Sequence, residues 1–391
     1  MSEIAAASLV AQIHAAPLRM VLAVTGGGSR AIADLLEVPG GSRTLLEAVV
    51  PYSAAALQDW LGALPEHYCS AQTARAMAVA AFLRAKTLAA AGQLVDADLV
   101  GIACTASLAS DRPKRGPHRI HVAWQRISAI ATLSIELVKG RRSRVEEEEL
   151  ATWLILNAVA EAASVADRVP LGNAADEPLV VQRTEAPAAW QDLLRGTSEA
   201  VRHEDGSIET AARQRPLDER TRRVVFPGAF NPLHDGHRRM ADVAAAILGQ
   251  PVEFEISIEN VDKPPLDFTE MEQRLAQFKT GQELWFTRAP TFERKAALFP
   301  DTTFVVGADT IRRIADPQYY CDDPGAAAAA IDAIGRHGGR FLVFGRHCGD
   351  RFESLNQLKL PESLQRLCRE VPAEQFRADI SSTRLRHSHE E

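Results

Sequence analysis

The sequence contains neither a cysteine pattern that could hold a metal nor an apolar run long enough to cross a membrane. Its five cysteines are scattered without a Cys-x-x-Cys pair, which excludes a zinc ribbon and a disulfide framework. The first residues also lack the basic-then-apolar layout of a signal peptide. We therefore expect a cytoplasmic protein that does not associate with a membrane.

An excess of basic charge is absent as well. The formal net charge is −7, and 46% of the residues are hydrophobic, which is ordinary for a globular enzyme and unfavourable for binding nucleic acid. Free nucleotides are therefore the more plausible anionic ligands. The length of 391 residues predicts two domains, because single hydrophobic cores stop growing well below that length.

One stretch combines the features of an anion-binding site. An apolar run at 224–226 is followed by Gly228-Ala229-Phe230-Asn231-Pro232-Leu233-His234-Asp235-Gly236-His237 and then by a helical pattern. This order predicts a strand, a tight turn and a helix, which we expect Asp235 to cap. Backbone N–H groups at the helix start and two imidazoles would then point to one place, so the stretch predicts a site for nucleotide phosphates.

Two further stretches carry similar chemistry. The β-branched run 302–306 opens into Gly307-Ala308-Asp309-Thr310, where Asp309 can accept hydrogen bonds from a ribose or cap the next helix. Near the end, hydroxyls and arginines follow one another in Ile380-Ser381-Ser382-Thr383-Arg384-Leu385-Arg386. Hydroxyls at a helix start followed by arginines predict a second phosphate clamp.

These motifs resemble a known superfamily. Residues 228–237 match Gly-x-Phe-x-Pro-x-His-x-Gly-His, the signature of the HIGH-motif nucleotidyltransferases, at all six fixed positions. Residues 380–386 resemble the second motif of that superfamily, and 307–310 resembles the Gly-Ala-Asp-Thr element of the nicotinamide and nicotinate mononucleotide adenylyltransferases. The alternative for the two histidines is a metal pair or two solvated loop side chains.

The resemblance implies a Rossmann-like parallel sheet for residues 222–391 and a set of site residues, with Mg²⁺ entering together with ATP and no metal site in the protein itself. The implied catalytic residues are His234, His237 and Arg386. The implied nucleotide-binding residues are Gly228, Ala229, Phe230, Gly236, Gly307, Asp309, Arg346, Ser381, Ser382 and Thr383. A loop after the second strand implies Asn260 and Lys263 for the acceptor.

The implied reaction transfers AMP from ATP to nicotinamide or nicotinate mononucleotide. The alternatives are cytidylyl or phosphopantetheine transfer within the same superfamily, or a non-catalytic sensor of pyridine nucleotides. The resemblance implies that the loop at 316–325 lies beside the pyridine, and this loop contains Asp316, Asp322 and Asp323 but no lysine or arginine. A pyridine carboxylate would meet like charges there, so we predict that the nicotinamide form is preferred.

The first half of the chain resembles a different family. The strand predicted at 18–24 runs into Thr25-Gly26-Gly27-Gly28-Ser29-Arg30, which alone predicts only a turn. Across about 18–165, the stretches 38–42, 49–53, 70–85 and 97–105 follow the order and approximate spacing of the CinA carboxy-terminal domain. Active members of that family hydrolyse the amide of nicotinamide mononucleotide with a serine. Here Ala23 stands where the resemblance places that serine, and Val24 where it places a cysteine. We expect a degenerate amidase that either senses a pyridine nucleotide or serves as a scaffold for a homo-oligomer.

The expected organisation is therefore two α/β domains. The first spans 1–168 and the second 222–391, with a linker at 169–221. That linker is rich in proline and glycine and shows little periodicity, although a strand at 179–182 and a helix at 188–194 fit its sequence.

Overall fold

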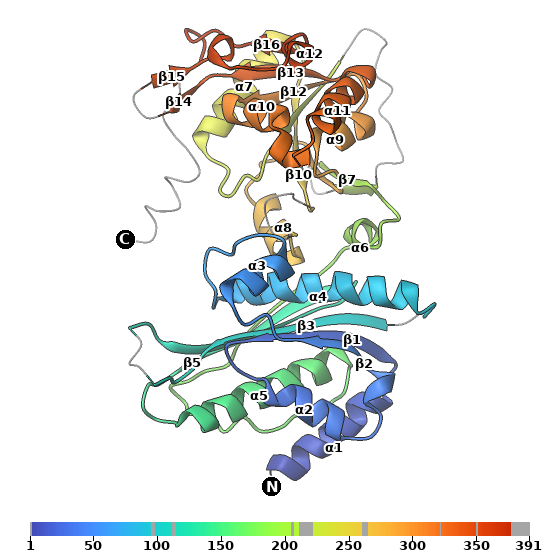
Figure 1. Ribbon diagram of the computed structural model, residues 1–391, viewed down its shortest axis with the longest axis vertical. Coiled ribbons are helices and arrows are strands. Elements are labelled where there is room, and N and C mark those ends of the chain that lie inside the picture. The colour runs from blue at the N-terminus through green and yellow to red at the C-terminus, as the bar shows by residue number, and fades with distance from the viewer. Residues whose placement is uncertain are drawn as a thin grey trace. The chain divides into compact units, whose positions relative to one another are not determined.

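The computed structural model describes residues 2–94, 98–111, 115–204, 207–210, 222–259, 265–320, 322–348 and 351–376. The chain forms two compact units, and each has its own sheet. The first unit comprises Met1–Gln191 with Asp262–Thr269, and the second comprises Asp192–Val261 with Glu270–Glu391. Both units combine helices with a mixed sheet, so the expected α/β class is confirmed (Figure 1).

The first unit contains a six-stranded sheet in the order β2-β1-β3-β4-β5-β6. β1 is parallel to β2 and β3, and β4 to β6 continue the sheet antiparallel. Its strands are β1 (Leu18–Thr25), β2 (Leu45–Val49), β3 (Asp98–Ser107), β4 (His118–Gln125), β5 (Ala129–Leu137) and β6 (Val180–Glu185). Its helices are α1 (Ser2–Ala15), α2 (Arg30–Glu37), η1 (Gly41–Arg43), α3 (Ala54–Leu61), α4 (Ala71–Ala91), α5 (Arg144–Ala162) and α6 (Ala188–Arg195).

Helices cover both faces of this sheet. α3 and α4 lie on one face, and α1, α2 and α5 lie on the other (Figure 1). α4 is capped by Ser70, whose hydroxyl accepts the Thr73 N–H at 3.1 Å. It packs so closely on β3 that a Cβ at Gly101 would lie 2.1 Å from the Ala78 carbonyl oxygen. The apolar run of β1 is buried because both faces of the strand are covered.

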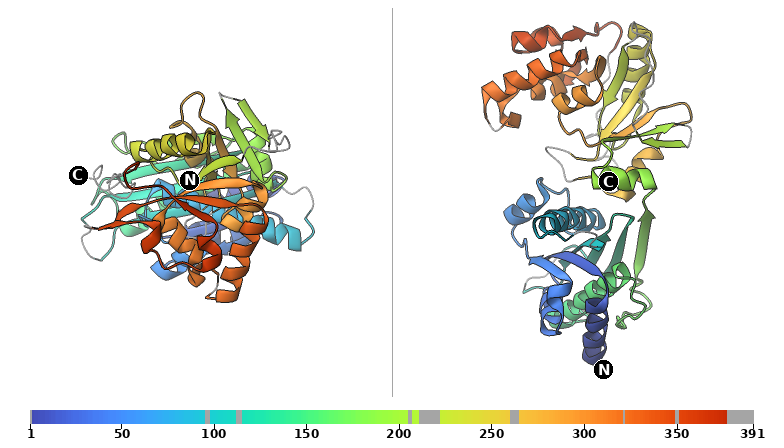
Figure 2. Two further views of the ribbon diagram at one scale, coloured as in Figure 1. Left: turned by 90° about the horizontal axis from the view of Figure 1, so that it is seen from above. Right: turned by 90° about the vertical axis from the view of Figure 1, so that its right-hand side faces the viewer.

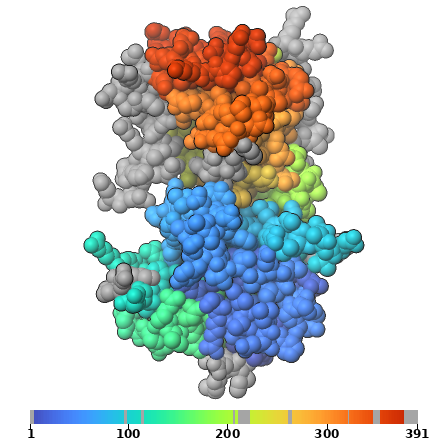
Figure 3. Space-filling view, in the orientation of Figure 1, coloured from blue at the N-terminus to red at the C-terminus, as the bar shows by residue number. Residues whose placement is uncertain are grey.

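The segment from α3 to α4 forms part of the surface of this unit (Figure 3). Leu64 and Tyr68 in this segment are exposed. Buried alanines and leucines of α3 and α4 pack against the sheet. This segment therefore contributes Leu57, Leu61 and Met77 to the core and exposes Leu64 and Tyr68.

The second unit contains an eight-stranded sheet in the order β16-β13-β12-β9-β10-β11-β7-β8. The strands from β16 to β11 are all parallel, and β7 and β8 add an antiparallel hairpin. Its strands are β7 (Ala200–Glu204), β8 (Ser207–Thr210), β9 (Arg223–Pro227), β10 (Val252–Ser257), β11 (Leu284–Thr287), β12 (Thr302–Gly307), β13 (Arg340–Phe344) and β16 (Cys368–Glu370). A separate hairpin joins β14 (Arg346–Cys348) and β15 (Arg351–Glu353).

The helices of this unit lie on both faces of the parallel strands. They are α7 (Asp235–Leu248), α8 (Phe268–Leu275), α9 (Phe292–Leu298), α10 (Ala308–Ala315), η2 (Pro317–Tyr320), α11 (Pro324–Arg336), η3 (Leu355–Gln357) and α12 (Glu362–Gln365), of which α8 begins in residues assigned to the first unit. Seen from above, α7 (yellow) lies across the sheet from α11 (orange) (Figure 2). The three central residues of β9 are buried, and because successive side chains point to opposite faces, both faces of this strand are covered. Because the strands from β16 to β11 are parallel, their carboxyl ends meet at one edge of the sheet.

The segment 169–221 contributes to both sheets. Its strand β6 pairs with β5 in the first unit, and its strand β7 pairs with β11 in the second. The sequence of this segment shows little periodicity. Its strands β6 and β7 are therefore fixed by pairing with strands that lie far away in the sequence.

Residues 265–269, which follow β10 in sequence, belong to the first unit. The Arg75 Nε donates to the Asp267 carboxylate at 2.8 Å, and both side chains are buried. The Thr269 hydroxyl lies 3.0 Å from that of Thr184. The first unit is therefore built from two separate parts of the chain. Among the described helices, none has the length and apolar character needed to span a membrane.

Candidate active site

The turn after β9 is shaped by glycine. The Gly228 N–H donates to the Glu255 carbonyl at 2.9 Å, which ties the turn to the neighbouring strand β10. A Cβ at Gly228 would lie 2.6 Å from the ring of Phe230, so only glycine leaves room for that ring. Phe230 itself adopts φ +43°, a left-handed conformation that ordinary residues rarely take.

Phe230 anchors this turn from below. Its side chain is 2% exposed and meets the rings of Phe226, Phe254 and Phe278 edge to face. It also packs against the imidazole of His237, with ring centroids 5.1 Å apart. Such aromatic pairs stabilise the packing by about 1 kcal/mol each beyond the area they bury. Phe230 therefore positions the histidine pair, while the exposed Ala229 forms the outer surface of the turn.

The residue that caps α7 is His234, and the expectation that Asp235 caps it is wrong. His234 has the extended backbone of a cap, with φ −123° and ψ 170°, whereas Asp235 already lies in the first helical turn. The His234 N–H donates to Nδ1 of His237 at 3.4 Å. The helix start is thus fixed by the two histidines, and Asp235 contributes negative charge near the positive end of the helix.

The two imidazoles are stacked and neutral. Their ring centroids lie 3.7 Å apart with an angle of 20° between the planes. Burial, together with the smaller effect of the neighbouring His234, lowers the pKa of His237 to about 3. Burial also lowers the pKa of His234, against the opposing effect of Asp235. Because Nδ1 of His237 accepts a hydrogen bond, the neutral ring carries its proton on Nε2, which makes Nε2 a donor.

The side chain of Gln277 binds the backbone of this turn, a role that the sequence did not predict. Its Oε1 accepts the Leu233 N–H at 2.7 Å, and its Nε2 donates to the Phe230 carbonyl at 3.2 Å. One side chain therefore satisfies backbone groups on both sides of Pro232. Gln277 lies 44 residues beyond Leu233, so no local pattern could have indicated this role.

The Gly-Ala-Asp turn lies at the end of β12, which pairs with β9. Gly307 is the cap residue of α10, and Asp309 lies in its first turn, so the cap role considered for Asp309 belongs to Gly307. A Cβ at Gly307 would lie 2.8 Å from Oδ1 of Asp309. The carboxylate is thus folded over the end of the strand, at the same sheet edge as the histidine pair.

Other predicted site residues fall at the margins of the described structure. Gly236 is buried in the first turn of α7, and Arg346 begins β14, where its backbone pairs with Glu353. In the loop expected beside the pyridine, Asp323 caps α11 by accepting the Gly325 N–H at 2.7 Å. The predicted residues outside the described ranges are Asn260, Lys263, Ser381, Ser382, Thr383 and Arg386.

The glycine turn of the first unit, between β1 and α2, is closely packed. Gly26 adopts φ +78°, and a Cβ there would lie 1.9 Å from the Ala106 carbonyl oxygen. A Cβ at Gly27 would lie 2.5 Å from the side chain of Leu108, which is fully buried. The second loop of this unit, which runs from Ala106 at the end of β3 through Leu108, thus fills the space in front of the turn.

The hydroxyl and backbone donors of Ser29 are also engaged. Its N–H and its Oγ donate to the carboxylate of Glu148 at 2.7 and 3.0 Å. Ala23 and Val24, which replace the serine and cysteine of the amidase motif, are buried inside the sheet. The chain's own carboxylate therefore lies at the start of α2, where an anionic ligand would otherwise bind.

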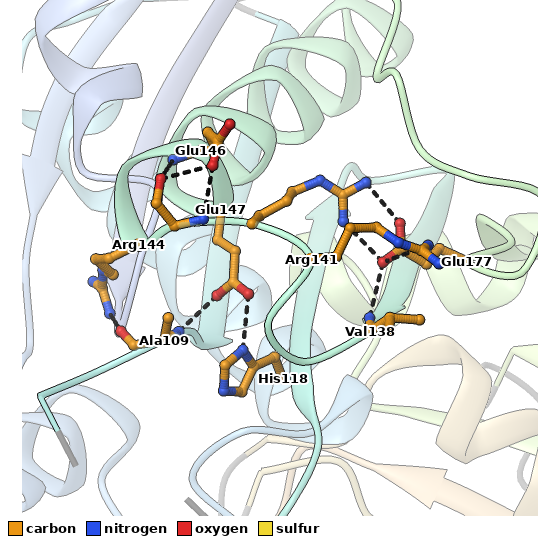
Figure 4. A network of polar contacts seen from close by, with 10 residues as sticks. Ala109, His118, Val138, Arg141, Arg144, Glu146, Glu147 and Glu177 are labelled. Atoms are coloured by element: carbon orange, nitrogen blue, oxygen red, sulfur yellow. Dashed lines mark hydrogen bonds and ion pairs between the residues drawn. The ribbon is translucent and has the colours of Figure 1, made fainter. Parts of the chain in front are cut away.

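A buried glutamate fixes the second loop (Figure 4). Glu147 is fully buried, and its carboxylate accepts the Ala109 N–H at 2.6 Å and the His118 Nδ1–H at 2.8 Å. Arg144 donates to the carbonyls of Ala109 and Gly26 at 3.2 and 3.0 Å. Two loops and the start of α5 are joined by these contacts, so this end of the first unit is held closed.

In the second unit, a strand, a turn with two stacked histidines and a helix meet at the carboxyl edge of a parallel sheet. This arrangement, together with the motif at 228–237, is the one that the resemblance to the HIGH-motif nucleotidyltransferases implies. Residues 225–388 match the sequence profile of the cytidylyltransferase-like family. This part of the chain is accordingly a cytidylyltransferase-like domain with a Rossmann-like fold.

Several solved structures resemble part of the chain, and they are CinA-family proteins. The competence/damage inducible protein CihA from Agrobacterium tumefaciens is 20% identical, covers 42% of this chain and 96% of its own, and has a TM-score of 0.32. A CinA superfamily protein from Escherichia coli is 18% identical over 42% and 88% of the two chains, with a TM-score of 0.28. A third, from Klebsiella pneumoniae, is 16% identical over 42% and 96%, with a TM-score of 0.32. No curated protein sequence matches the chain significantly.

Proposed function

We propose that the second unit transfers AMP from ATP to nicotinamide or nicotinate mononucleotide, forming a dinucleotide and pyrophosphate. The observation that carries this proposal is the neutral, stacked pair of His234 and His237 at the start of α7. Asp309 folded over the end of the adjacent parallel strand supports a ribose contact at the same edge. The resemblance of the first unit to an amidase of nicotinamide mononucleotide favours a pyridine acceptor.

The proposed reaction needs no general base. The acceptor's 5′-phosphate is already ionised at neutral pH, so one of its oxygens attacks the α-phosphorus of ATP in line. A new P–O bond forms there, and the bond from the α-phosphorus to the bridging oxygen breaks, so that pyrophosphate leaves with both bonding electrons. The enzyme's part is to position the two phosphates and to stabilise the negative charge of the transition state.

The histidines suit this part because they are neutral donors. A neutral imidazole with its proton on Nε2 can donate a hydrogen bond to a phosphate oxygen without first losing a counterion. Arg386, Ser381, Ser382 and Thr383 would complete the phosphate site, as the second motif implies. Lys263 and Asn260 are proposed for the acceptor side.

Mg²⁺ fits this site as a partner of ATP. In the described residues, no group of three histidines, cysteines or acids is placed to hold a metal. Mg²⁺ commonly binds through substrate phosphates and keeps several waters, so it would enter with the triphosphate. When bound, it would neutralise charge on the phosphates.

For the first unit, we propose a scaffold without amidase activity, with a homo-oligomer formed through this unit. The absence of a hydroxyl at Ala23 and the packing of Leu108 against Gly27 support this proposal. We further propose that the protein is cytoplasmic and that its ligands are ATP and a mononucleotide acceptor.

The test uses the full-length protein with ATP, Mg²⁺ and a panel of acceptors, and it follows the release of pyrophosphate. The panel contains nicotinamide mononucleotide, nicotinate mononucleotide and phosphopantetheine, and a parallel reaction supplies CTP with phosphocholine. Release that depends on a pyridine mononucleotide supports the proposal. Release only with CTP or only with phosphopantetheine would replace it with the corresponding transferase.

A further inference from the structure

Three neighbouring strands end side by side in the second unit. The histidine motif follows β9, Glu259 follows β10 and Arg288 follows β11. The strands are in register at this edge, since the Gly228 N–H bonds the Glu255 carbonyl and the Ile258 N–H bonds the Thr287 carbonyl at 2.8 Å. Adjacent strands lie about 4.8 Å apart, so β9 and β11 are separated by roughly 10 Å. This distance is comparable to the length of an extended mononucleotide.

Arg288 is held in place from two sides. Its N–H donates to the Glu199 carbonyl at 3.0 Å, and its Nε donates to Oε1 of Glu259 at 2.9 Å. A Cβ at Gly196 would lie only 2.3 Å from Nη1 of Arg288, so this glycine leaves room for the guanidinium. The side chains of Arg288 and Glu259 are 26% and 32% exposed. The pair is thus positioned by the fold and still accessible to a ligand.

The charges around this pair cancel. Nη1 of Arg288 lies 3.7 Å from the carboxylate of Glu199, and Nη1 of Arg294 lies 3.8 Å from Oε2 of Glu259. Two cations and two anions therefore share the end of β10 and β11. These two contacts are longer than hydrogen bonds, so the Arg288 Nη groups and the Glu259 Oε2 can each bind a ligand as donor and as acceptor.

A group that offers one acceptor and one donor without net charge matches this arrangement. A carboxamide has a carbonyl oxygen for the guanidinium and an NH₂ for the carboxylate, whereas a carboxylate would face Glu259 with like charge. We propose that the Arg288–Glu259 pair, rather than the loop at 316–325, recognises the carboxamide at the end of the acceptor remote from the reacting phosphate. This inference rests on the proposed adenylyl transfer and names the nicotinamide form as the acceptor.

The test compares kcat/KM for nicotinamide and nicotinate mononucleotide in the full-length protein. Glu259→Gln replaces the carboxylate of the pair with a neutral amide and, among the described residues, leaves Arg288 and Arg294 with only the carboxylate of Glu199 nearby. We expect the preference to move towards the nicotinate form by tenfold or more, because the resulting excess of positive charge favours a carboxylate. Arg288→Met should lower the use of the nicotinamide form at least tenfold, mainly through KM.

A matched control exists at the other end of β11. Glu283 accepts from Arg202 at 2.8 Å, and Glu283→Gln removes an ion pair there whose side chains are 17% and 15% exposed, less than those of Arg288 and Glu259. This change should leave the ratio of the two kcat/KM values unchanged. A fall in kcat/KM by the same factor for both acceptors in Glu259→Gln is the result expected of a change that only weakens the fold. That outcome would overturn the recognition role and leave the proposed adenylyl transfer standing. If the unmodified protein uses neither acceptor, the proposed function fails and the inference fails with it.

Discussion

Each unit contains a parallel strand, a glycine-containing turn and a helix, yet the two turns differ in what surrounds the helix start. In the first unit, Leu108 packs against Gly27 and Glu148 binds the donors of Ser29. In the second, Phe230 and Gln277 support the turn from behind and beside it, and the His234 and His237 rings are only partly buried. Under the proposed function, the comparison implies that a strand, a turn and a helix are not sufficient for an anion site. The donors at the helix start must also remain available to a ligand.

The largest expected effect comes from the second turn. His237→Ala should reduce nucleotidyl transfer about 100-fold, because it removes one donor to the transition state, worth about 3 kcal/mol. Steady-state pyrophosphate release measures it, and circular dichroism checks the fold. His337→Ala, at the exposed end of α11, is the control and should retain the parent rate. Activity of His237→Ala within about threefold of the parent would mean that the histidine is not part of the site.

A buried charge in the first unit should matter for stability instead. Glu177 is fully buried and accepts from both Nη atoms of Arg142 at 2.8 and 2.7 Å and from the Val138 N–H at 2.8 Å (Figure 4). Glu177→Gln should lower the free energy of unfolding of this unit by roughly 3 kcal/mol, since it leaves Arg142 without its partner. Urea unfolding measures the change, and nucleotidyl transfer at low urea concentration should be unchanged.

The same pair predicts a dependence on pH. Hydrogen bonds from Arg142 lower the pKa of Glu177 from 4.5 to about 2. Its stabilising contribution is therefore complete above about pH 4.5 and is lost as the pH falls towards 2. The stability difference between the parent and Glu177→Gln should shrink across this window. A difference that stays constant down to pH 2 would show that the carboxylate does not titrate with the fold.

His203 in the second unit should affect the stability of that unit at higher pH than Glu177 does in the first. Burial lowers the pKa of His203 to about 4, from an ordinary value of 6.5. Below pH 6.5 the unfolded chain takes up a proton that the folded unit does not, so stability falls between pH 6.5 and 4. We expect a loss of up to about 2 kcal/mol for this group between pH 6.5 and 5. In thermal unfolding, His203→Phe should reduce this loss, and an unaltered pH dependence would contradict the assignment.

The smallest expected effect tests the first turn directly. The full-length protein should release no ammonia from nicotinamide mononucleotide, and Ala23→Ser should not change this result. A serine at position 23 would be buried inside the sheet, with Leu108 packed against the turn that follows. Ammonia release by the unmodified protein that disappears in Ser29→Ala would show that the nucleophile lies at Ser29 instead.

Local patterns predicted much of this structure. The strand–turn–helix around His234, the strand before Gly307 and the strand at 18–24 follow from apolar runs and turn residues that are contiguous in sequence. The cap of α7 was assigned one residue too late, because the sequence pattern favours an aspartate at a cap over a histidine.

The missed residues share a different feature. Gln277 reaches a turn 44 residues earlier, Glu148 reaches Ser29 across 119 residues, and Glu259 pairs with Arg288 across 29 residues. Each is an ordinary polar residue whose partner is set by the packing of strands and helices. No periodicity or motif marks such a residue before the fold is known.

The buried pair of Arg75 and Asp267 affects how this chain can be divided. A fragment that stops before residue 262 would leave the Arg75 guanidinium buried without its carboxylate, at a cost of about 3–5 kcal/mol. A fragment that starts at 222 would lack β7, which covers the side of β11 in the second sheet. No single cut of the chain yields two intact units. Recombination at one point therefore cannot exchange either unit, and proteolysis at one point cannot release either unit intact.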